Sequence, residues 1–264
     1  MKAAVNGIQM AFDDEGSGPP VVLLHGYPFN RTMWRDQVDE LKRHHRVIVP
    51  DLRGHGETAV TPGVVTMRDM AKDVAALLQS LEVSRPVLGG LSMGGYVALA
   101  FCRLLPLEAR SLVLADTRAQ ADTEEGKRNR ELQAEKALSE GMEAIADGLL
   151  PKLLTPETIS QRPDVVKRLR DMMVATAPEG AAAALRGMAQ RPDRIPFLSN
   201  IIAPTLIVVG SEDALTPVAD AELMRREIGG SRLKIIEGAG HVSNLENPEE
   251  FNRVLVEFLR DVEV

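Results

Sequence analysis

The sequence predicts an α/β protein built around a mostly parallel sheet of about eight strands, flanked by helices. Three observations support this fold class. Short apolar runs suited to buried strands recur along the chain, and segments with a helical spacing of apolar residues separate them. Strands and helices that alternate in this way form parallel strands joined by right-handed crossovers. Between about residues 118 and 195 the strands stop and only helical patterns remain, after which the alternation resumes.

The first half of the chain contains most of the expected strands and begins with an antiparallel hairpin. Asn6-Gly7 joins two short strands within residues 4–12, because this dipeptide supplies the positive φ angles of a tight turn. The later apolar runs are continuous, which is typical of strands covered on both faces. They predict strands at 21–24, 47–49, 86–90 and 111–115, with helices at 32–43, 66–81 and 94–105 between them.

The stretch between residues 118 and 195 is expected to form a helical cap, inserted after the sixth strand. Its apolar residues recur at helical spacing, as from Leu138 through Met142 to Leu149. The charge-rich run 124–131 is interpreted as a solvated face of one of these helices.

The expected core is therefore discontinuous in sequence. Residues 1–117 and 196–264 are expected to form one α/β core domain around the inserted cap of residues 118–195. The elements predicted after the cap are strands at 205–209 and 233–236 and helices at 217–228 and 248–261.

The composition indicates a globular protein that acts on small molecules. The 264 residues carry a net charge of −7, whereas a nucleic-acid-binding protein needs a basic face. No run of about 18 apolar residues is present that could span a bilayer. The N-terminal residues lack the apolar stretch of a secretory signal, which predicts a cytoplasmic protein. The single cysteine, Cys102, is interpreted as a buried thiol, and the oligomeric state is left open.

The segment Gly90-Leu91-Ser92-Met93-Gly94-Gly95 stands between an expected strand and an expected helix. A Gly-x-Ser-x-Gly in this position is the sequence form of a nucleophile elbow, a sharp turn with the serine exposed at its tip. Side chains at positions 90 and 94 would collide with backbone, so glycine is required at both. The motif alone also fits a glycine-rich turn in any α/β protein, so the assignment of Ser92 depends on its partners.

Two candidate partners of Ser92 follow the strands beyond the cap. A serine hydroxyl needs a base to take its proton, and the base needs an acid to orient it. Asp213 comes directly after the seventh expected strand and His241 after the eighth. Because ligands bind at the carboxyl ends of parallel strands, the three residues are expected to converge at that edge. Asp116, after the sixth strand, is the alternative acid.

The loop after strand 21–24 is expected to complete the site. The backbone N–H groups of Tyr27 and Met93 are expected to hold an oxyanion, Met93 from the positive end of its helix. Gly26 permits close backbone approach, and His25 is expected to hold the loop by hydrogen bonding without transferring protons. A similar structural role is expected for the loop residues Asp51, Arg53 and His55.

Together these motifs resemble the α/β-hydrolase superfamily over nearly the full length of the chain. Within it, the chain is most similar to the small capped group of carboxylesterases, enol-lactone hydrolases and cofactor-free haloperoxidase-like perhydrolases. The resemblance implies that Ser92, Asp213 and His241 form the catalytic triad, and no metal or cofactor is expected. The matching segments, in chain order, are His25-Gly26-Tyr27-Pro28, Asp51-Leu52-Arg53-Gly54-His55-Gly56, Gly90-Leu91-Ser92-Met93-Gly94-Gly95, Gly210-Ser211-Glu212-Asp213 and Gly238-Ala239-Gly240-His241.

Residues that distinguish other members of the superfamily narrow the expected reaction to ester hydrolysis. Ser92 stands where dehalogenases and epoxide hydrolases use aspartate, and Met93 stands where proline iminopeptidases carry tryptophan. The expected reaction is hydrolysis of carboxylic esters with small to medium acyl groups, through an acyl-enzyme on Ser92, with water as second reactant. The alternatives are enol-lactone hydrolysis or haloperoxidase-like perhydrolysis on the same residues and, more remotely, a ligand receptor.

Aromatic and thioether side chains are expected to line the substrate pocket. An aromatic wall is suggested by Tyr27, Phe29 and Trp34 near the oxyanion loop and by Tyr96 just past the elbow. The helical spacing of Trp34 also fits the core. Methionine adapts its shape, so methionines in the cap favour tolerance toward different acyl groups. The expected pocket residues are His25, Gly26, Phe29, Trp34, Met142, Met172, Met173 and Met188, with Leu149 and Leu153 as further candidates from the cap.

Overall fold

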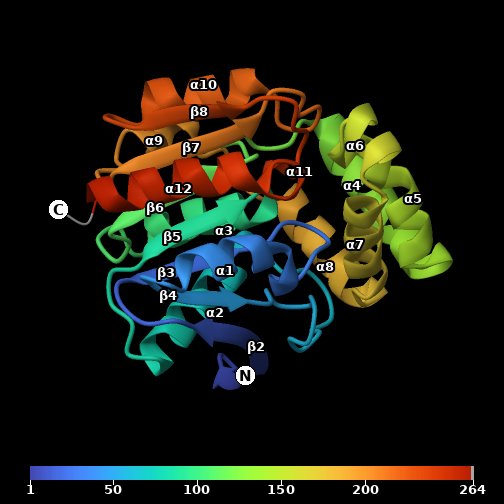
Figure 1. Cartoon of the computed structure of the whole chain (residues 1–264). Coiled ribbons are helices and arrows are strands. Elements are labelled where there is room, and N and C mark those ends of the chain that lie inside the picture. Colours follow the sequence, from blue (N-terminus) through green and yellow to red (C-terminus); the bar gives the residue numbers. More distant parts are fainter. Residues whose placement is uncertain (263–264) are drawn as a thin grey trace.

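The computed structural model describes residues 1–262 and has an eight-stranded sheet at its centre (Figure 1). The strand order is β1-β2-β4-β3-β5-β6-β7-β8. β2 runs antiparallel to both of its neighbours, and the strands from β4 to β8 in this order are parallel. This confirms the predicted α/β-hydrolase architecture with its N-terminal hairpin. The strands span Lys2–Val5 (β1), Ile8–Glu15 (β2), Pro20–Leu24 (β3), Arg46–Pro50 (β4), Val87–Leu91 (β5), Ser111–Ala115 (β6), Thr205–Gly210 (β7) and Arg232–Ile236 (β8).

Consecutive residues of the central strands enter two different hydrophobic cores. Along β3, Val22 and Leu24 pack with α2 and α3, whereas Val21 and Leu23 pack with α1 and α12. Side chains alternate between the faces of a strand, so helices must cover both faces of this sheet. Burying one aliphatic side chain contributes about 1.5–3 kcal/mol, which explains why these strands are apolar throughout. The helices span Arg35–Leu41 (α1), Met67–Ser80 (α2), Met93–Leu104 (α3), Val218–Glu227 (α10), Ser243–Glu246 (α11) and Pro248–Val262 (α12).

The N-terminal region differs from the expectation in two details. The Asn6-Gly7 turn has the expected positive φ angles of 44° and 76°. β2 continues to Glu15, beyond the expected end, because it pairs with β4 as well as with β1. The helix expected at 32–43 is divided into a 3-10 helix, Arg31–Trp34, and α1. The Asn30 side chain accepts a hydrogen bond from the Thr32 N–H, which caps this short first turn.

Helices occupy the chain between β6 and β7, and most of them gather at one end of the sheet (Figure 1). The exception is α9, Ile195–Leu198, which packs against α10. The single apolar face expected from Leu138 to Leu149 is wrong, because Gly141, at φ 84°, ends one helix there and the next begins at Met142. The gathered helices span Glu124–Glu140 (α4), Met142–Leu153 (α5), Pro156–Gln161 (α6), Pro163–Val174 (α7) and Pro178–Ala189 (α8).

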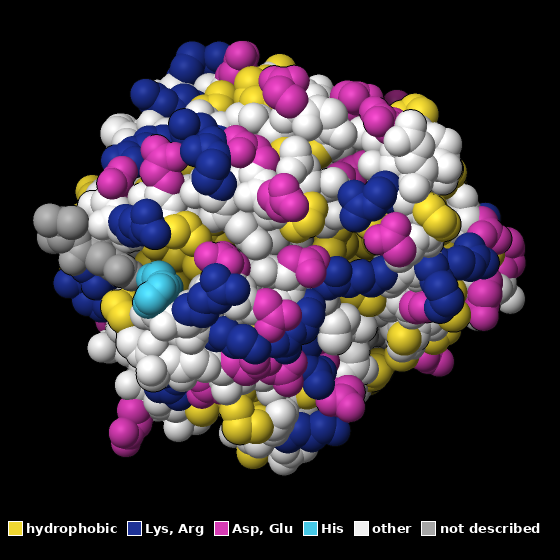
Figure 2. Space-filling model, in the orientation of Figure 1, with side chains coloured by type: hydrophobic (Ala, Val, Ile, Leu, Met, Phe, Trp, Pro, Cys, Tyr) yellow, Lys and Arg dark blue, Asp and Glu magenta, His cyan; other side chains and the backbone are white. Residues whose placement is uncertain are grey.

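The surface carries charges of both signs. On the face shown in Figure 2, acidic and basic side chains are interspersed, with no extended region of a single sign. Within residues 1–262, no helix combines the length and apolar character that a membrane crossing requires. Cys102 is buried, as expected.

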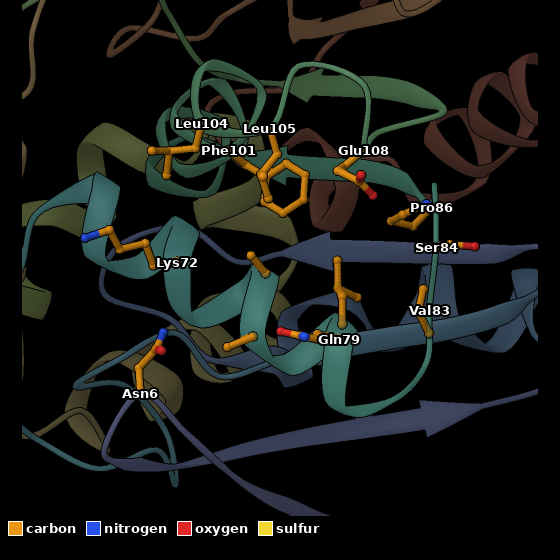
Figure 3. A pocket seen from close by; sticks show the side chains of 13 residues that line it. Asn6, Lys72, Gln79, Val83, Ser84, Pro86, Phe101, Leu104, Leu105 and Glu108 are labelled. Atoms are coloured by element: carbon orange, nitrogen blue, oxygen red, sulfur yellow. The ribbon is translucent and has the colours of Figure 1, made fainter.

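A groove of about 620 Å³ lies between α2 and α3, next to the amino end of β5 (Figure 3). Apolar side chains form much of its wall, among them Leu78, Phe101 and Leu105. Among the described residues that line it there is a serine, Ser84, but no histidine that could activate it. Volume alone therefore does not mark this groove as a reactive site.

Candidate active site

The chain reverses sharply at Ser92, between β5 and α3. Ser92 has φ 53° and ψ −113°, a conformation that side-chain-bearing residues adopt only under strain. A Cβ atom at Gly90 would lie 2.2 Å from the carbonyl oxygen of Gly94, and one at Gly94 would lie 2.2 Å from that of Leu24. Only hydrogen fits at both positions, so the glycines of the motif allow the turn to be this tight.

The loops after β7 and β8 bring Asp213 and His241 to this turn. His241 Nε2 lies 2.8 Å from Ser92 Oγ, and His241 Nδ1 lies 2.9 Å from each oxygen of the Asp213 carboxylate. Thr216 also binds the carboxylate, through its backbone N–H at 2.9 Å and its hydroxyl at 2.7 Å. With Nδ1 donating to Asp213, Nε2 is left as an acceptor for the serine proton. The three side chains thus form a continuous hydrogen-bonded chain.

Within this hydrogen-bonded chain of side chains, Asp213 and His241 each favour the charged form of the other. Burial disfavours the charged form of His241, but the neighbouring Asp213 carboxylate outweighs it and raises the pKa of His241. Burial likewise disfavours the Asp213 carboxylate, but His241 and the hydrogen bonds from Thr216 outweigh this and lower the pKa of Asp213. A carboxylate that stays ionised beside the imidazole favours proton uptake from Ser92.

Asp116, the alternative acid, occupies a different position. Its carboxylate accepts hydrogen bonds from the Gly210 N–H at 2.9 Å and from the Ser243 hydroxyl at 2.6 Å. Complete burial and the nearby charge of Asp213 raise the pKa of Asp116 well above its ordinary value. Within residues 1–262, it is Asp213 and not Asp116 that contacts His241 directly. Asp116 connects the loops that carry Asp213 and His241.

Two buried histidines hold the loop that follows β3. His25 Nδ1 donates to the Gly26 carbonyl at 2.9 Å, and His25 Nε2 accepts from the Leu52 N–H at 2.9 Å. The ring of His55 lies 5.1 Å from that of His25, and His55 Nδ1 donates to the Arg53 carbonyl at 3.1 Å. Burial lowers the pKa of His25 to about 4 and that of His55 to about 3, so both stay neutral at neutral pH. This geometry is that of structural histidines.

Two backbone N–H groups near Ser92 are free to bind a ligand. Neither the Tyr27 N–H nor the Met93 N–H donates to another group within residues 1–262. Met93 is the first residue of α3, where the helix dipole is positive. The loop that carries Tyr27 is held from the α7–α8 side, because the Thr176 hydroxyl donates to the Pro28 carbonyl at 2.8 Å.

A cavity of about 290 Å³ opens above Ser92 and His241. Helices α4, α5 and α8 form part of its wall together with the loops at the carboxyl ends of the strands. Within residues 1–262, no group of three or more His, Cys, Asp or Glu side chains is arranged to hold a metal ion. The lining residues are Tyr27, Ser92, Tyr96, Arg118, Asp122, Gly126, Asn129, Arg130, Gln133, Leu149, Leu153, Met188, Leu215, Thr216 and His241.

Few of the expected pocket residues line this cavity. Met188 does, together with Leu149 and Leu153. Of the expected aromatic wall, Tyr27 and Tyr96 line the cavity, whereas Phe29 and Trp34 are buried in the core. His25 and Gly26, which precede Tyr27 in the loop after β3, do not line the cavity either. The remaining expected residues pack elsewhere: Met142 beside Ile145, and Met172 and Met173 in the core shared with α1 and α12.

The cavity also contains polar residues that the sequence analysis did not select. Arg118 and Asp122 follow β6, and their position after the carboxyl end of a parallel strand was a signal for them. Arg130 lies in the run interpreted as a solvated face, but its side chain is only 19% exposed. Thr216 is close in sequence to Asp213, which was its only signal.

Comparisons with known proteins agree with this geometry. Residues 19–248 match the family model of the alpha/beta hydrolase fold. A thermophilic esterase from Thermogutta terrifontis, solved with malate bound, is 44% identical, and the match covers 100% of this chain and 99% of that chain with a TM-score of 0.97. The enol-lactonase from Burkholderia xenovorans LB400 is 31% identical over 98% of this chain and 100% of that chain, with a TM-score of 0.93.

A curated relative points the same way. The 3-oxoadipate enol-lactonase 2 of Acinetobacter baylyi is 28% identical over 237 residues, which cover 90% of this chain and 87% of the relative. The similarity to esterases and enol-lactonases confirms the resemblance inferred from the motifs. The protein belongs to the α/β-hydrolase family.

Proposed function

We propose that the protein is a serine hydrolase that cleaves carboxylic esters with small to medium acyl groups. The observation that carries this proposal is the hydrogen-bonded chain from Ser92 through His241 to Asp213, with 2.8 Å between Ser92 Oγ and His241 Nε2. In this proposal the three residues are the catalytic triad. The esterase and enol-lactonase relatives support the same reaction class.

In the first step Ser92 Oγ attacks the ester carbonyl carbon while His241 Nε2 takes the hydroxyl proton. The carbonyl oxygen becomes an oxyanion, which the free N–H groups of Tyr27 and Met93 would bind. Loss of one such donor costs about 3 kcal/mol in the barrier in comparable enzymes. His241 then returns the proton to the departing alkoxide, so the ester C–O bond breaks and an acyl-Ser92 remains.

In the second step water replaces the alcohol. His241 Nε2 takes a proton from the water, whose oxygen attacks the acyl carbon, and Ser92 leaves with the proton returned from His241. Asp213 stays ionised and stabilises the imidazolium in both steps. Hydrogen peroxide in place of water would give a peracid, which is the perhydrolase alternative.

Enol-lactone hydrolysis is the second candidate function, because two of the relatives above are enol-lactonases. A lactone is a cyclic ester, so the same attack by Ser92 opens the ring. The leaving group then stays attached to the acyl-enzyme. A cavity of about 290 Å³ is at the small end of ligand pockets and suits such compact substrates.

We also propose that residues 118–195 function as a cap over the core formed by residues 1–117 and 196–264. Arg130, Leu149 and Met188 support this proposal, since they come from that segment and line the cavity above Ser92.

The decisive experiment measures turnover of 4-nitrophenyl esters from acetate to octanoate, with mass spectrometry of the quenched enzyme. The native protein is expected to turn over repeatedly and to carry an acyl group on Ser92. Ser92→Ala is expected to lower kcat/KM by about 10⁶-fold. The matched control is Ser84→Ala, an exposed serine on the groove at the other end of β5, which should leave turnover unchanged.

Three outcomes would overturn the proposal. Retained activity in Ser92→Ala would exclude the acyl-Ser92 mechanism. A single round of labelling without turnover would instead indicate a receptor. Much faster ester consumption with added peroxide than with water alone would indicate a perhydrolase. The peracid formed would oxidise added bromide, and bromination of a monochlorodimedone-type acceptor would report it.

A further inference from the structure

Three arginines surround a single buried carboxylate at the side of the cavity. Asp122 accepts hydrogen bonds from Arg118 at 3.2 Å, from Arg191 at 2.8 Å and from Arg130. The Asp122 side chain is only 2% exposed. One carboxylate cannot neutralise three guanidinium groups, so this part of the protein has an excess of positive charge.

Arg191 is directed into the protein and away from the cavity above Ser92. Its guanidinium donates to the Met188 and Gln120 carbonyls, both at 3.0 Å, and its Cζ lies 4.2 Å from the centre of the Tyr96 ring. Its side chain is 4% exposed and does not line the cavity above Ser92. Arg191 therefore orients Asp122 and Tyr96 and is not available to a ligand.

Arg118 and Arg130 are different, because both line the cavity with donors to spare. The buried Arg118 Nε has no hydrogen-bond partner within residues 1–262. One terminal nitrogen of Arg130 lies 3.5 Å from the Met188 sulfur, and the other lies 3.5 Å from Asp122, so both contacts are weak. A guanidinium presents a planar fork of donors that matches the two oxygens of a carboxylate.

A third donor faces the same space. The hydroxyl of Tyr27 is buried, lines the cavity and has no hydrogen-bond partner within residues 1–262. Arg130 is close enough to Tyr27 to act on it electrostatically. A buried hydroxyl without a partner costs free energy unless a ligand satisfies it.

The remaining acidic groups near the cavity do not supply the missing negative charge. Asp213 is paired with His241, and Asp116 accepts hydrogen bonds from Gly210 and Ser243. Asp220 offsets part of the charge of Arg118 electrostatically, but even together with Asp122 it gives two carboxylates against three guanidinium groups. Arg118, Arg130 and Arg191 share the Asp122 carboxylate, so the positive charge that remains on the cavity side of the group is left for a ligand.

We propose that the cavity selects esters or lactones that carry a carboxylate, which Arg130 and Arg118 bind with the Tyr27 hydroxyl while Ser92 attacks the ester group. This inference rests on the proposed ester hydrolysis and adds the substrate class to it. The carboxylate can belong to the leaving group or to the acyl group, and the experiment distinguishes the two.

The test compares neutral and anionic members of two substrate pairs. The first pair is 4-acetoxybenzoate and methyl 4-acetoxybenzoate, with the charge on the leaving group. The second is monomethyl adipate and dimethyl adipate, with the charge on the acyl group. In the first pair the neutral ester has the better leaving group, so preference for the anion cannot come from intrinsic reactivity. We expect kcat/KM to favour the anion by about 10- to 100-fold in one pair.

Arginine substitutions assign the preference to the proposed residues. Arg130→Met is expected to remove the preference, because kcat/KM should fall about 10- to 100-fold more for the anionic ester than for its neutral partner, and Arg118→Met is expected to reduce it. The matched control is Arg186→Met on α8, whose guanidinium pairs with Glu131 at 2.6 Å and does not line the cavity. This variant should keep the preference of the native protein.

The results separate failure of this inference from failure of ester hydrolysis. Hydrolysis of the neutral esters without preference for either anion would overturn the carboxylate site alone, as would an equal loss for both esters in Arg130→Met. No hydrolysis of any ester would overturn the proposed function. If Arg130→Met does not fold, competitive inhibition of the native protein by 4-hydroxybenzoate and its methyl ester decides: stronger inhibition by the anion supports the site, and equal inhibition overturns it.

Discussion

The cavity above Ser92 and the groove between α2 and α3 lie at opposite ends of β5, and they differ more in the reactive groups that line them than in volume. The groove at the amino end has a volume of about 620 Å³, against about 290 Å³ for the cavity above Ser92. The larger one is formed mainly by the flanks of two helices, α2 and α3. The smaller one lies where the carboxyl ends of the parallel strands and their loops converge, next to the first N–H groups of α3.

The difference follows from the topology of a parallel sheet. Loops at the carboxyl ends can place Ser92, Asp213 and His241 within hydrogen-bond distance although they are far apart in sequence. At the amino end no such convergence occurs around Ser84, so its hydroxyl remains an ordinary alcohol. The following predictions test this contrast.

The largest expected effect distinguishes the cavity above Ser92 from the groove at the amino end of β5. His241→Ala removes the base that takes the Ser92 proton, and kcat/KM for a 4-nitrophenyl ester is expected to fall by about 10⁶-fold. Lys72→Ala, in the groove at the amino end, is expected to leave it unchanged. A comparable fall in Lys72→Ala would show that the groove takes part in the reaction.

The next effect distinguishes the roles of Asp213 and Asp116, two buried aspartates at the carboxyl end of the sheet. Asp213→Asn removes the charge that orients His241, and kcat is expected to fall by about 10⁴-fold. Asp116→Asn leaves the contact between His241 and Asp213 in place. The carboxylate of Asp116 accepts a hydrogen bond from the Ser243 N–H, and an amide NH₂ group in that position could not accept it. We expect a stability loss of about 1–3 kcal/mol and a far smaller kinetic effect. Thermal denaturation measures the stability loss, and steady-state kinetics measures kcat. A lower kcat in Asp116→Asn than in Asp213→Asn would contradict the assignment.

The pH dependence follows from the direction of the His241 pKa. His241 must be neutral to take the serine proton, and Asp213 raises its pKa above 6.5. The kcat/KM is therefore expected to fall about tenfold per pH unit on the acid side of a midpoint above 6.5. Asp213→Asn should shift that midpoint downward. A rate that is flat with pH through this range, or an upward shift in the variant, would contradict His241 as base.

The smallest effect concerns backbone packing. A Cβ atom in Gly94→Ala would lie 2.2 Å from the Leu24 carbonyl oxygen and 2.9 Å from that of His25. We expect a loss of about 3 kcal/mol in unfolding free energy. The control is Gly148→Ala in α5, where nothing lies within 4 Å, and a gain of about 1 kcal/mol is expected. Equal stability of the two variants in thermal denaturation would show that close approach at the elbow is dispensable.

Much of the fold and part of the candidate site could be predicted from local pattern. Continuous apolar runs located the buried strands close to their observed ends, because both faces of the sheet are covered by helices. The division of the helix at Trp34 was missed, because spacing alone does not distinguish a 3-10 turn from an α-helix. Phe29 was assigned to the pocket from its closeness in sequence to the oxyanion loop, although its ring packs into the core.

The sequence by itself determined the order of elements and the three candidate catalytic residues, Ser92, Asp213 and His241. It could do so because each follows a strand, and the ends of parallel strands meet at one edge whatever their separation in the chain. Only the tertiary structure decided which side chains line the cavity. The direction in which α4 turns Arg130 toward Asp122 depends on packing between distant elements, which no local spacing encodes.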